Sequence, residues 1–380
     1  MAGVFIYVQH LLGSGHLHRM ARIAHELART GVPVTLCSGG MPVRALRLPA
    51  SVRFVQLEPL HCAPDDFTRL LDSRDQDLDG KLRGQRLAQL FAALADSAPR
   101  VALIESFPFA RRQMRFELKP LLKRLRELSI PTVCSIRDIL QVKSKAGREL
   151  ETLALLTDYF AAVLVHGDRR VVELQATFKH AAQIACDVHY TGYVAGPAAV
   201  SSSDEGGAAE IVVSAGGGAV GYPLFRAALD ACRAGCQADK RWRFLLGGGL
   251  DAEQGERLRA DAPANARITP VSESFTRLLQ SCSLSISQAG YNTVVDVLQA
   301  GCRGLLVPYA QSGEMEQTLR TQRLQEMGLI GGYTCQPLSA ARLAVRVDEL
   351  IAQPVASADP PLNLHGARNT VALLQTLMCS

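Results

Sequence analysis

The chain of 380 residues lacks the cysteine spacing of zinc sites and of small disulfide-bonded domains. Its ten cysteines are scattered singly, without a Cys-x-x-Cys pair, and Cys232 and Cys236 lie one helical turn apart with no second pair nearby. Several stand in apolar, strand-like stretches, where a reduced thiol behaves as a small buried hydrophobic residue. We therefore expect reduced structural thiols, as in a cytoplasmic protein, and no metal site.

Long hydrophobic runs are also missing. The N-terminal stretch MAGVFIYVQHLL has no basic segment before an apolar run of only strand length, and IVVSAGGGAVGYPLF contains four glycines and a proline. Neither stretch predicts a membrane-spanning helix. The expected location is cytoplasmic, with peripheral contact at the inner membrane face as an open alternative.

The sequence has little net charge and no excess of polar residues. A formal charge of +5 is too small to indicate a nucleic-acid-binding protein. Hydrophobic residues make up 48% and charged residues 20%, which is typical of a folded globular protein and excludes a disordered one. The length suits two domains.

Two glycine-rich turns lack parts of the common nucleotide fingerprints. In the first turn, Gly13 and Gly15 are followed by His18 where a dinucleotide site needs a third glycine. The second turn, Gly216–Gly221, has the glycines, but the next strand ends in Gly247–Gly249 without the acidic residue that binds ribose. Neither turn has the Lys-Ser/Thr of a P-loop, so a dehydrogenase and an ATP or GTP hydrolase are both disfavoured. Each turn could still bind a phosphate or simply join a strand tightly to a helix.

Buried strands alternate with amphipathic helices along the chain, which predicts parallel sheets covered on both faces. A stretch rich in glycine, alanine and serine interrupts the pattern, and the alternation then starts again. The fold class is therefore α/β, with two doubly wound, Rossmann-like domains that face each other across a cleft. The predicted parts are a first domain at 1–192, a linker at 193–210, a second domain at 211–362 and a helix at 363–380 that packs back on the first domain.

Residues 283–328 carry the most specific pattern, a strand followed by Ser-Gln-Ala-Gly-Tyr-Asn-Thr, an amphipathic helix with an acidic residue, a second strand and a Glu-Gln pair. This stretch resembles the C-terminal donor domain of GT-B glycosyltransferases, and family 28 in particular, whose members include the peptidoglycan N-acetylglucosaminyltransferase. The GSGH turn, the linker and the SAGGG turn occur in the matching order. The resemblance implies an inverting glycosyltransferase that needs no metal and moves a sugar, most simply an N-acetylhexosamine, from UDP to an acceptor. It also implies that 1–192 is the acceptor-binding domain and 211–362 the donor domain.

The resemblance also assigns the donor-binding residues. It places the diphosphate at the glycine turn and at the start of the following helix, the ribose hydroxyls at Asp296, the sugar hydroxyls at Glu316 and Gln317, and the uracil edge near Pro270 and Val271. Glu316 stands where close relatives have glutamine, which leaves the identity of the sugar open. The complete expected donor set is Gly216, Gly217, Gly218, Val271, Ser287, Gly290, Asn292, Thr293, Asp296, Glu316 and Gln317.

By the same resemblance His16 is the catalytic base, because it occupies the position of the family's N-terminal histidine, and an imidazole of near-neutral pKa can accept the proton of an attacking hydroxyl. The alternative is a structural role at the turn. We expect a structural role for His18 and leave His10 undecided. The expected acceptor-side residues are Gly13, Ser14, Gly15, Glu105, Arg111 and Arg137.

The acceptor is the least defined part of the prediction. The stretch FPFARR resembles a poorly characterised branch of glycosyltransferases, which disfavours the peptidoglycan precursor and leaves a small-molecule or a lipid-linked acceptor. The basic residues of segment 104–128 form either a solvated helix face or a contact with an anionic membrane. Two other functions share the fold, a UDP-sugar hydrolase or 2-epimerase and a nucleotide-sugar-binding subunit without catalysis. The oligomeric state is open.

Overall fold

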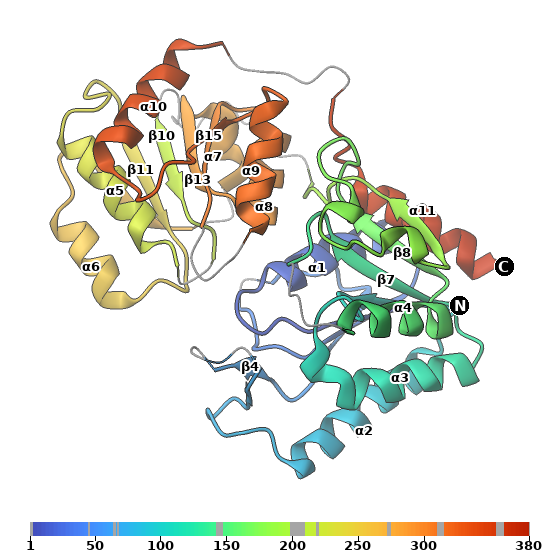
Figure 1. The fold of residues 1–380 in the computed structure, drawn as a ribbon. Helices are drawn as coiled ribbons and strands as arrows, with labels where there is room; N and C mark the ends of the chain where they lie inside the picture. Colours follow the sequence, from blue (N-terminus) through green and yellow to red (C-terminus); the bar gives the residue numbers. More distant parts are fainter. Residues whose placement is uncertain are drawn as a thin grey trace. The chain divides into compact units, whose positions relative to one another are not determined.

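The computed structural model describes residues 3–44, 46–63, 66, 68–141, 147–197, 210–217, 220–271, 275–309, 315–354 and 361–379. The chain divides into two compact units. Unit 1 comprises Met1–Val194 and His365–Ser380, and unit 2 comprises Ala195–Leu364 (Figure 1). Residues 198–209 of the predicted linker lie outside the described residues.

Unit 1 is built on a parallel sheet of seven strands in the order β3-β2-β1-β6-β7-β8-β9. Its strands are β1 (Val4–Val8), β2 (Val34–Ser38), β3 (Val52–Gln56), β6 (Val101–Glu105), β7 (Thr132–Arg137), β8 (Ala162–His166) and β9 (Asp187–Tyr190), with β4 (His61–Cys62) and β5 (Leu70–Leu71) as a separate antiparallel pair. Its helices are α1 (Gly15–Arg29), α2 (Gly80–Ser97), α3 (Arg115–Glu127), α4 (Arg148–Tyr159) and α11 (Gly366–Cys379).

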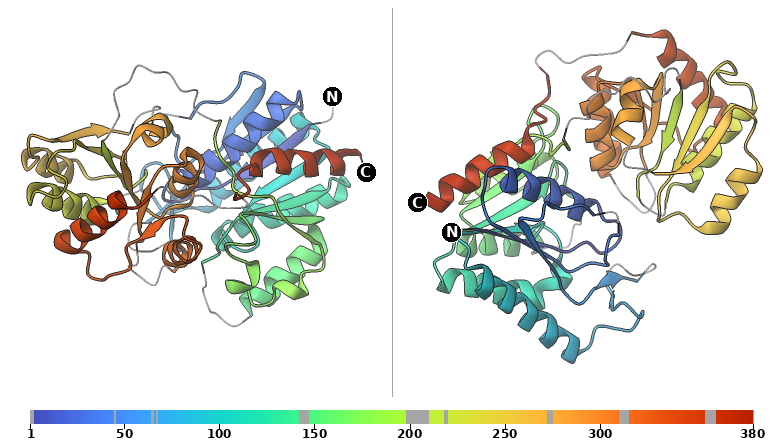
Figure 2. Two further views of the ribbon diagram at one scale, coloured as in Figure 1. Left: turned by 90° about the horizontal axis from the view of Figure 1, so that it is seen from above. Right: turned by 180° about the vertical axis from the view of Figure 1, so that it is seen from behind.

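Both faces of this sheet are buried, because successive side chains of a strand point to opposite sides. From β1, Val4 and Ile6 pack in a core with α1 and α11, whereas Phe5 and Tyr7 pack in a second core with α2, α3 and α4. Figure 2 shows α1 and α11 side by side on the same face of the sheet. The last helix of the chain therefore belongs to the core of unit 1.

Unit 2 repeats the plan with a parallel sheet of six strands in the order β12-β11-β10-β13-β14-β15. Its strands are β10 (Ile211–Ser214), β11 (Trp242–Leu246), β12 (Ala266–Pro270), β13 (Leu284–Gln288), β14 (Gly304–Val307) and β15 (Gly331–Gly332). Its helices are α5 (Tyr222–Arg233), α6 (Ala252–Ala260), α7 (Phe275–Ser281), α8 (Tyr291–Ala300), α9 (Glu316–Glu326) and α10 (Ala340–Ala352). Two parallel-sheet α/β domains are thus confirmed.

The strand order reverses once in each sheet, between β1 and β6 in unit 1 and between β10 and β13 in unit 2. Ligands of doubly wound sheets bind at the carboxyl ends of the strands at such a reversal. The loops that follow these four strands are therefore the places to look for a site. Among the described residues, no helix combines the length and the apolar character needed to cross a membrane.

Candidate active site

His16 lies at the strand-order reversal of unit 1. Strand β1 ends at Val8, and Ser14 is the residue that caps the start of α1, so His16 stands in the first helical turn after the strand. The neighbouring strand β6 ends with Glu105. The two side chains meet, with 2.6 Å between His16 Nδ1 and Glu105 Oε1.

Glu105 is completely buried and accepts three hydrogen bonds on the same oxygen. Besides His16, the donors are Arg19 Nη2 at 2.5 Å and Ser106 Oγ at 2.5 Å. Burial alone would raise the pKa of the Glu105 carboxyl, but the charges and hydrogen bonds of its partners hold this pKa well below its ordinary value. Glu105 is therefore a carboxylate. We expected Glu105 at the edge of an acceptor pocket. In the structure its side chain has no exposed surface and contacts His16.

The His16 imidazole is neutral near pH 7. Burial and, to a smaller extent, the positive charges of Arg111 and Arg19 lower its pKa to about 3, against the opposing effect of Glu105. A neutral imidazole next to a carboxylate donates from Nδ1, so its Nε2 carries a lone pair and no proton. The side chain keeps 18% of its surface exposed. Glu105 therefore holds the tautomer that a general base needs. The pKa of about 3 is far below the near-neutral value expected from the sequence, so the imidazole without a bound acceptor is a weak base.

The remaining acceptor-side residues of the prediction surround this pair. Arg111 follows β6 and is half-buried, and its Nε donates to the carbonyl oxygen of Gln9 at 2.6 Å. Arg137, the last residue of β7, is half-buried and close enough for its charge to lower the pKa of Arg111. Gly13 is exposed, whereas Ser14 and Gly15 are partly buried at the start of α1. His10 is buried, with Nε2 3.0 Å from the carbonyl oxygen of Met41, and His18 is half-buried on α1.

The glycine turn of unit 2 lies at the second strand-order reversal. Gly216 has a positive φ of 69°, and a Cβ placed on it would lie 3.2 Å from Thr293 Oγ1 at the start of α8. A Cβ on Gly247 would lie 2.1 Å from the carbonyl oxygen of Gly216. The turn after β10, the end of β11 and the first turn of α8 therefore meet, which brings Gly216, Gly217, Gly290 and Thr293 into one neighbourhood. Gly218 lies outside the described residues.

Other expected donor residues have partners within unit 2. Asp296 and Thr293 are buried on α8, and Asn292 is half-buried. Glu316 begins α9 and accepts from Arg320 Nη2 at 2.8 Å, while Gln317 Oε1 accepts from the Tyr309 amide at 3.0 Å. Ser287, also expected at the donor, has a fully buried hydroxyl that lies 2.8 Å from the hydroxyl of Ser285.

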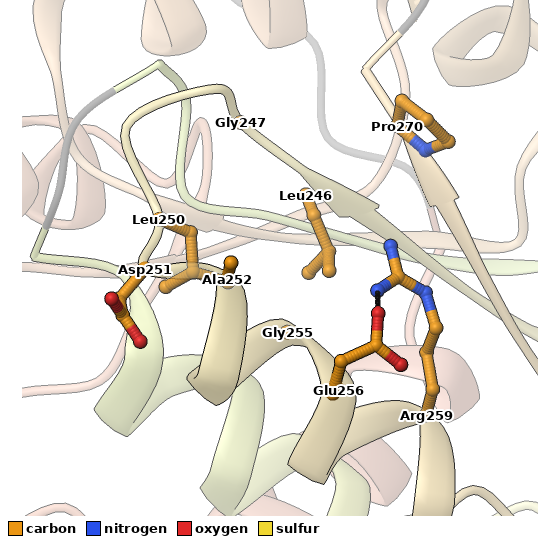
Figure 3. Close-up of a pocket in the computed structure, with 9 residues that line it drawn as sticks. All are labelled: Leu246, Gly247, Leu250, Asp251, Ala252, Gly255, Glu256, Arg259 and Pro270. Carbon is orange, nitrogen blue, oxygen red and sulfur yellow. Dashed lines mark hydrogen bonds and ion pairs between the residues drawn. The ribbon is translucent and has the colours of Figure 1, made fainter.

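A pocket of about 230 Å³ lies where β11 and β12 end beside α6 (Figure 3). Leu246, Leu250 and Pro270 supply apolar lining, and Arg259 is ion-paired with Glu256 at 2.7 Å on the α6 side. The volume is below that of most small-molecule sites, so the pocket could hold a fragment of a ligand but not a whole nucleotide sugar. Val271, next to Pro270, has 42% of its surface exposed, and its amide donates to Leu246.

Comparison with protein families identifies unit 2. Residues 212–371 match the family model described as the glycosyltransferase family 28 C-terminal domain. Most of unit 2 thus resembles a family 28 C-terminal domain. The matched segment contains the glycine turn, α8 and α9, and it extends into the first turns of α11 in unit 1.

Solved glycosyltransferases extend the likeness to the whole chain. The glycotransferase of kitacinnamycin has a TM-score of 0.64 and 16% identity, with 100% of both chains covered. MurG of Acinetobacter baumannii has a TM-score of 0.58 and 15% identity, over 99% of this chain and 100% of that one. UGT2 of Phytolacca americana, complexed with UDP-2fluoro-glucose and pterostilbene, has a TM-score of 0.60 and 14% identity, over 99% and 94%. With the family 28 domain, this fold makes the chain a glycosyltransferase of the GT-B type that resembles family 28.

Proposed function

We propose that the protein is an inverting, metal-independent glycosyltransferase that moves a sugar, an N-acetylhexosamine, from UDP to an acceptor hydroxyl with His16 as general base. The observation that carries the proposal is the pair of His16 and Glu105 at the strand-order reversal, in which Nε2 of a neutral imidazole is left unprotonated. Metal independence rests on the family resemblance, and its test is full activity in the presence of a chelator.

In the proposed reaction the acceptor oxygen attacks the anomeric carbon while its proton passes to His16 Nε2. The bond between the anomeric carbon and the diphosphate oxygen breaks, and UDP leaves with the electron pair. A single direct displacement inverts the anomeric carbon. Glu105 stabilises the imidazolium that forms, because its carboxylate is already ionised and hydrogen-bonded to Nδ1. The amides of the Gly216 turn and of the first turn of α8 would stabilise the leaving diphosphate.

The donor is proposed as UDP-linked on the strength of the family resemblance. One similar structure contains UDP-2fluoro-glucose, which supports UDP, whereas another contains dTDP, which is therefore the main competitor. The cytoplasmic location and peripheral contact with an anionic membrane remain predictions from the sequence.

Replacing Asp296 with alanine should abolish stabilisation by UDP. A ligand that binds only the folded state raises the melting temperature, so UDP, dTDP, GDP, CDP, ADP and NAD⁺ can be compared on wild type and variant. UDP should give the largest shift on the wild type and little shift on Asp296→Ala, while Glu326→Ala, exposed on α9, should keep the full shift. A larger shift with dTDP would show that the donor is a dTDP-sugar, and a shift with NAD⁺ alone would refute the glycosyltransferase site.

A separate assay tests the alternative reaction. Release of free sugar from the UDP-sugar at a catalytic rate without acceptor would indicate a hydrolase.

Gly247→Ala should weaken UDP binding by displacing the Gly216 turn. The added methyl group would overlap the carbonyl oxygen of Gly216, a backbone atom that cannot rotate away. Gly248→Ala is the matched control, because a Cβ there meets nothing within 4 Å. The thermal shift with UDP should fall in the first variant and stay at the wild-type value in the second. Equal shifts in both variants would show that the turn does not contact the donor.

The rate should depend little on pH over a range in which an ordinary histidine becomes protonated. With a pKa of about 3 for His16, kcat/KM should stay level from pH 8 down to about pH 5. An unperturbed imidazole would lose about nine-tenths of the base form by pH 5.5. In the unfolded chain His16 binds a proton near pH 6.5, whereas in the folded chain it stays neutral down to about pH 3. The free energy of unfolding therefore decreases as the pH falls below 6.5. A midpoint near 6.5 in the kcat/KM profile would contradict the buried, neutral base.

A further inference from the structure

Arg111 is a half-buried guanidinium that uses one of its five N–H groups in hydrogen bonds to the residues that the structure describes. Its Nε donates to the Gln9 carbonyl oxygen at 2.6 Å. The part of the chain that the structure describes offers its two terminal nitrogens no hydrogen bond. A guanidinium presents a rigid fork of donors that matches the two oxygens of a carboxylate or a phosphate. The fork of Arg111 is therefore anchored at one end and unused at the other.

Among the described residues, no carboxylate forms an ion pair with Arg111. Glu105 lies near enough to raise the pKa of Arg111, but its Oε1 is bonded to Arg19 at 2.5 Å and to His16, and its buried Oε2 has no hydrogen bond to Arg111 within the described part of the chain. Burial is the largest effect on the pKa of Arg111 and lowers it, and the positive charge of Arg137 lowers it as well. An anion placed between these cations would be stabilised by both.

The backbone that holds Arg111 is in an uncommon conformation. Arg111 has a φ of 60° and Ser106, next to Glu105, has a φ of 63°, so one short turn contains two residues other than glycine in the left-handed region. Such residues cost of order 1 kcal/mol each and concentrate at ligand sites. The turn sends the Arg111 side chain back to the loop after β1, beside His16, whose pKa it lowers.

We propose that Arg111 binds an oxyanion of the acceptor, either a carboxylate or a phosphate, and that the acceptor is therefore an anionic hydroxy compound. The inference rests on the proposed function, because it presumes that His16 takes the acceptor proton. The bidentate contact fixes one end of the acceptor while its hydroxyl reaches His16 Nε2. The bound anion also offsets the positive charge that Arg111 places near the imidazole, which makes His16 a stronger base when the acceptor is in place.

A binding experiment tests the subsite without a known acceptor. The full chain is labelled with ¹⁵N-arginine and saturated with UDP, and the Arg111 Nε–H signal is assigned by its loss in Arg111→Lys. Inorganic phosphate and acetate are then titrated separately at constant ionic strength. One of them should shift the Arg111 signal saturably at concentrations of order 10 mM, as expected for a fragment-sized anion, and should leave Arg112 unmoved. No saturable shift by either anion, or an equal shift of Arg112, would overturn the proposal. Tighter binding of inorganic phosphate would indicate a phosphate on the acceptor, and tighter binding of acetate would indicate a carboxylate.

A kinetic experiment tests the same subsite through turnover. Acceptors are offered as matched pairs, hydroxy acids with their amides and phosphorylated alcohols with the parent diols, and UDP release is followed. The wild type should prefer the anionic member by roughly tenfold to a hundredfold, and Arg111→Gln should remove that preference by raising KM for the anionic member alone. Equal use of both members, or an equal loss on both in the variant, would overturn the proposal. If UDP did not stabilise the wild type, or if the wild type turned over no acceptor, the proposed function would be wrong. The anion titration would still show whether Arg111 binds an oxyanion.

Discussion

Alanine at position 16 should lower kcat by a factor of about 10² to 10⁴ and leave UDP binding unchanged. The loss follows from the position of the imidazole, whose Nδ1 is held by Glu105 while Nε2 has a lone pair for the acceptor proton. The residues expected to bind the nucleotide belong to unit 2, whereas His16 belongs to unit 1. The measurements are kcat with a saturating UDP-sugar and acceptor, and the thermal shift with UDP on the same preparation.

His25→Ala is the matched control for this variant. His25 lies on the same helix and is exposed, and its Nε2 lies 2.9 Å from the Arg47 carbonyl oxygen. It should keep wild-type kcat and UDP stabilisation. If His16→Ala lost UDP stabilisation together with turnover, His16 would be part of the donor site or of the fold. If it kept turnover, the base would be another group, and His10 would be the next candidate because it is buried near the same strand end.

The local pattern of the sequence is sufficient to predict the two α/β units. Strands that are buried on both faces read as short apolar runs, as in Val4–Val8, and amphipathic helices separate them. The same pattern does not predict which strands are neighbours in the sheet. The pairing of β1 with β6, which are separated by more than 90 residues, brings Glu105 to His16, and no periodicity in the chain encodes that contact. The one available signal was an acidic residue at the end of an apolar run.

For Ser287 the strand pattern predicts the burial of the side chain, whereas the family motif predicts a contact with the donor. Ser285 and Ser287 are two residues apart on one strand, so their side chains point to the same face of the sheet. A strand buried on both faces leaves such a hydroxyl without exposed surface. Gly290, Asn292 and Thr293, which come after the end of this strand, stand where a helix N-terminus exposes its amides, and their expected role stays a prediction.

Replacing Arg86 with methionine should destabilise unit 1 by about 3–5 kcal/mol. Arg86 on α2 is completely buried and makes two hydrogen bonds to Glu117 on α3, from Nε at 2.9 Å and from Nη2 at 2.7 Å. Its guanidinium also donates to the Gly39 carbonyl oxygen at 3.1 Å. Methionine fills the volume but leaves a buried carboxylate without its counter-ion, and this unpaired charge, more than the lost attraction, accounts for the cost.

Two comparisons separate the buried pair from general damage. Arg53→Met removes an exposed ion pair with Asp96 in the same unit and should cost at most about 1 kcal/mol. The double variant Arg86→Met/Glu117→Leu removes both charges and should recover part of the loss. No unpaired charge is left, but the buried Tyr7 hydroxyl and the Gly39 carbonyl oxygen lose their partners. Urea unfolding followed by far-ultraviolet circular dichroism reports both units, whereas the fluorescence of Trp242, buried in unit 2, reports that unit alone. The transition of unit 1 should move to lower urea while the Trp242 transition keeps its midpoint. If Arg86→Met were as stable as Arg53→Met, water or a rearranged donor would satisfy Glu117. The ion pair of Arg86 and Glu117 would then contribute little to the packing of α2 on α3.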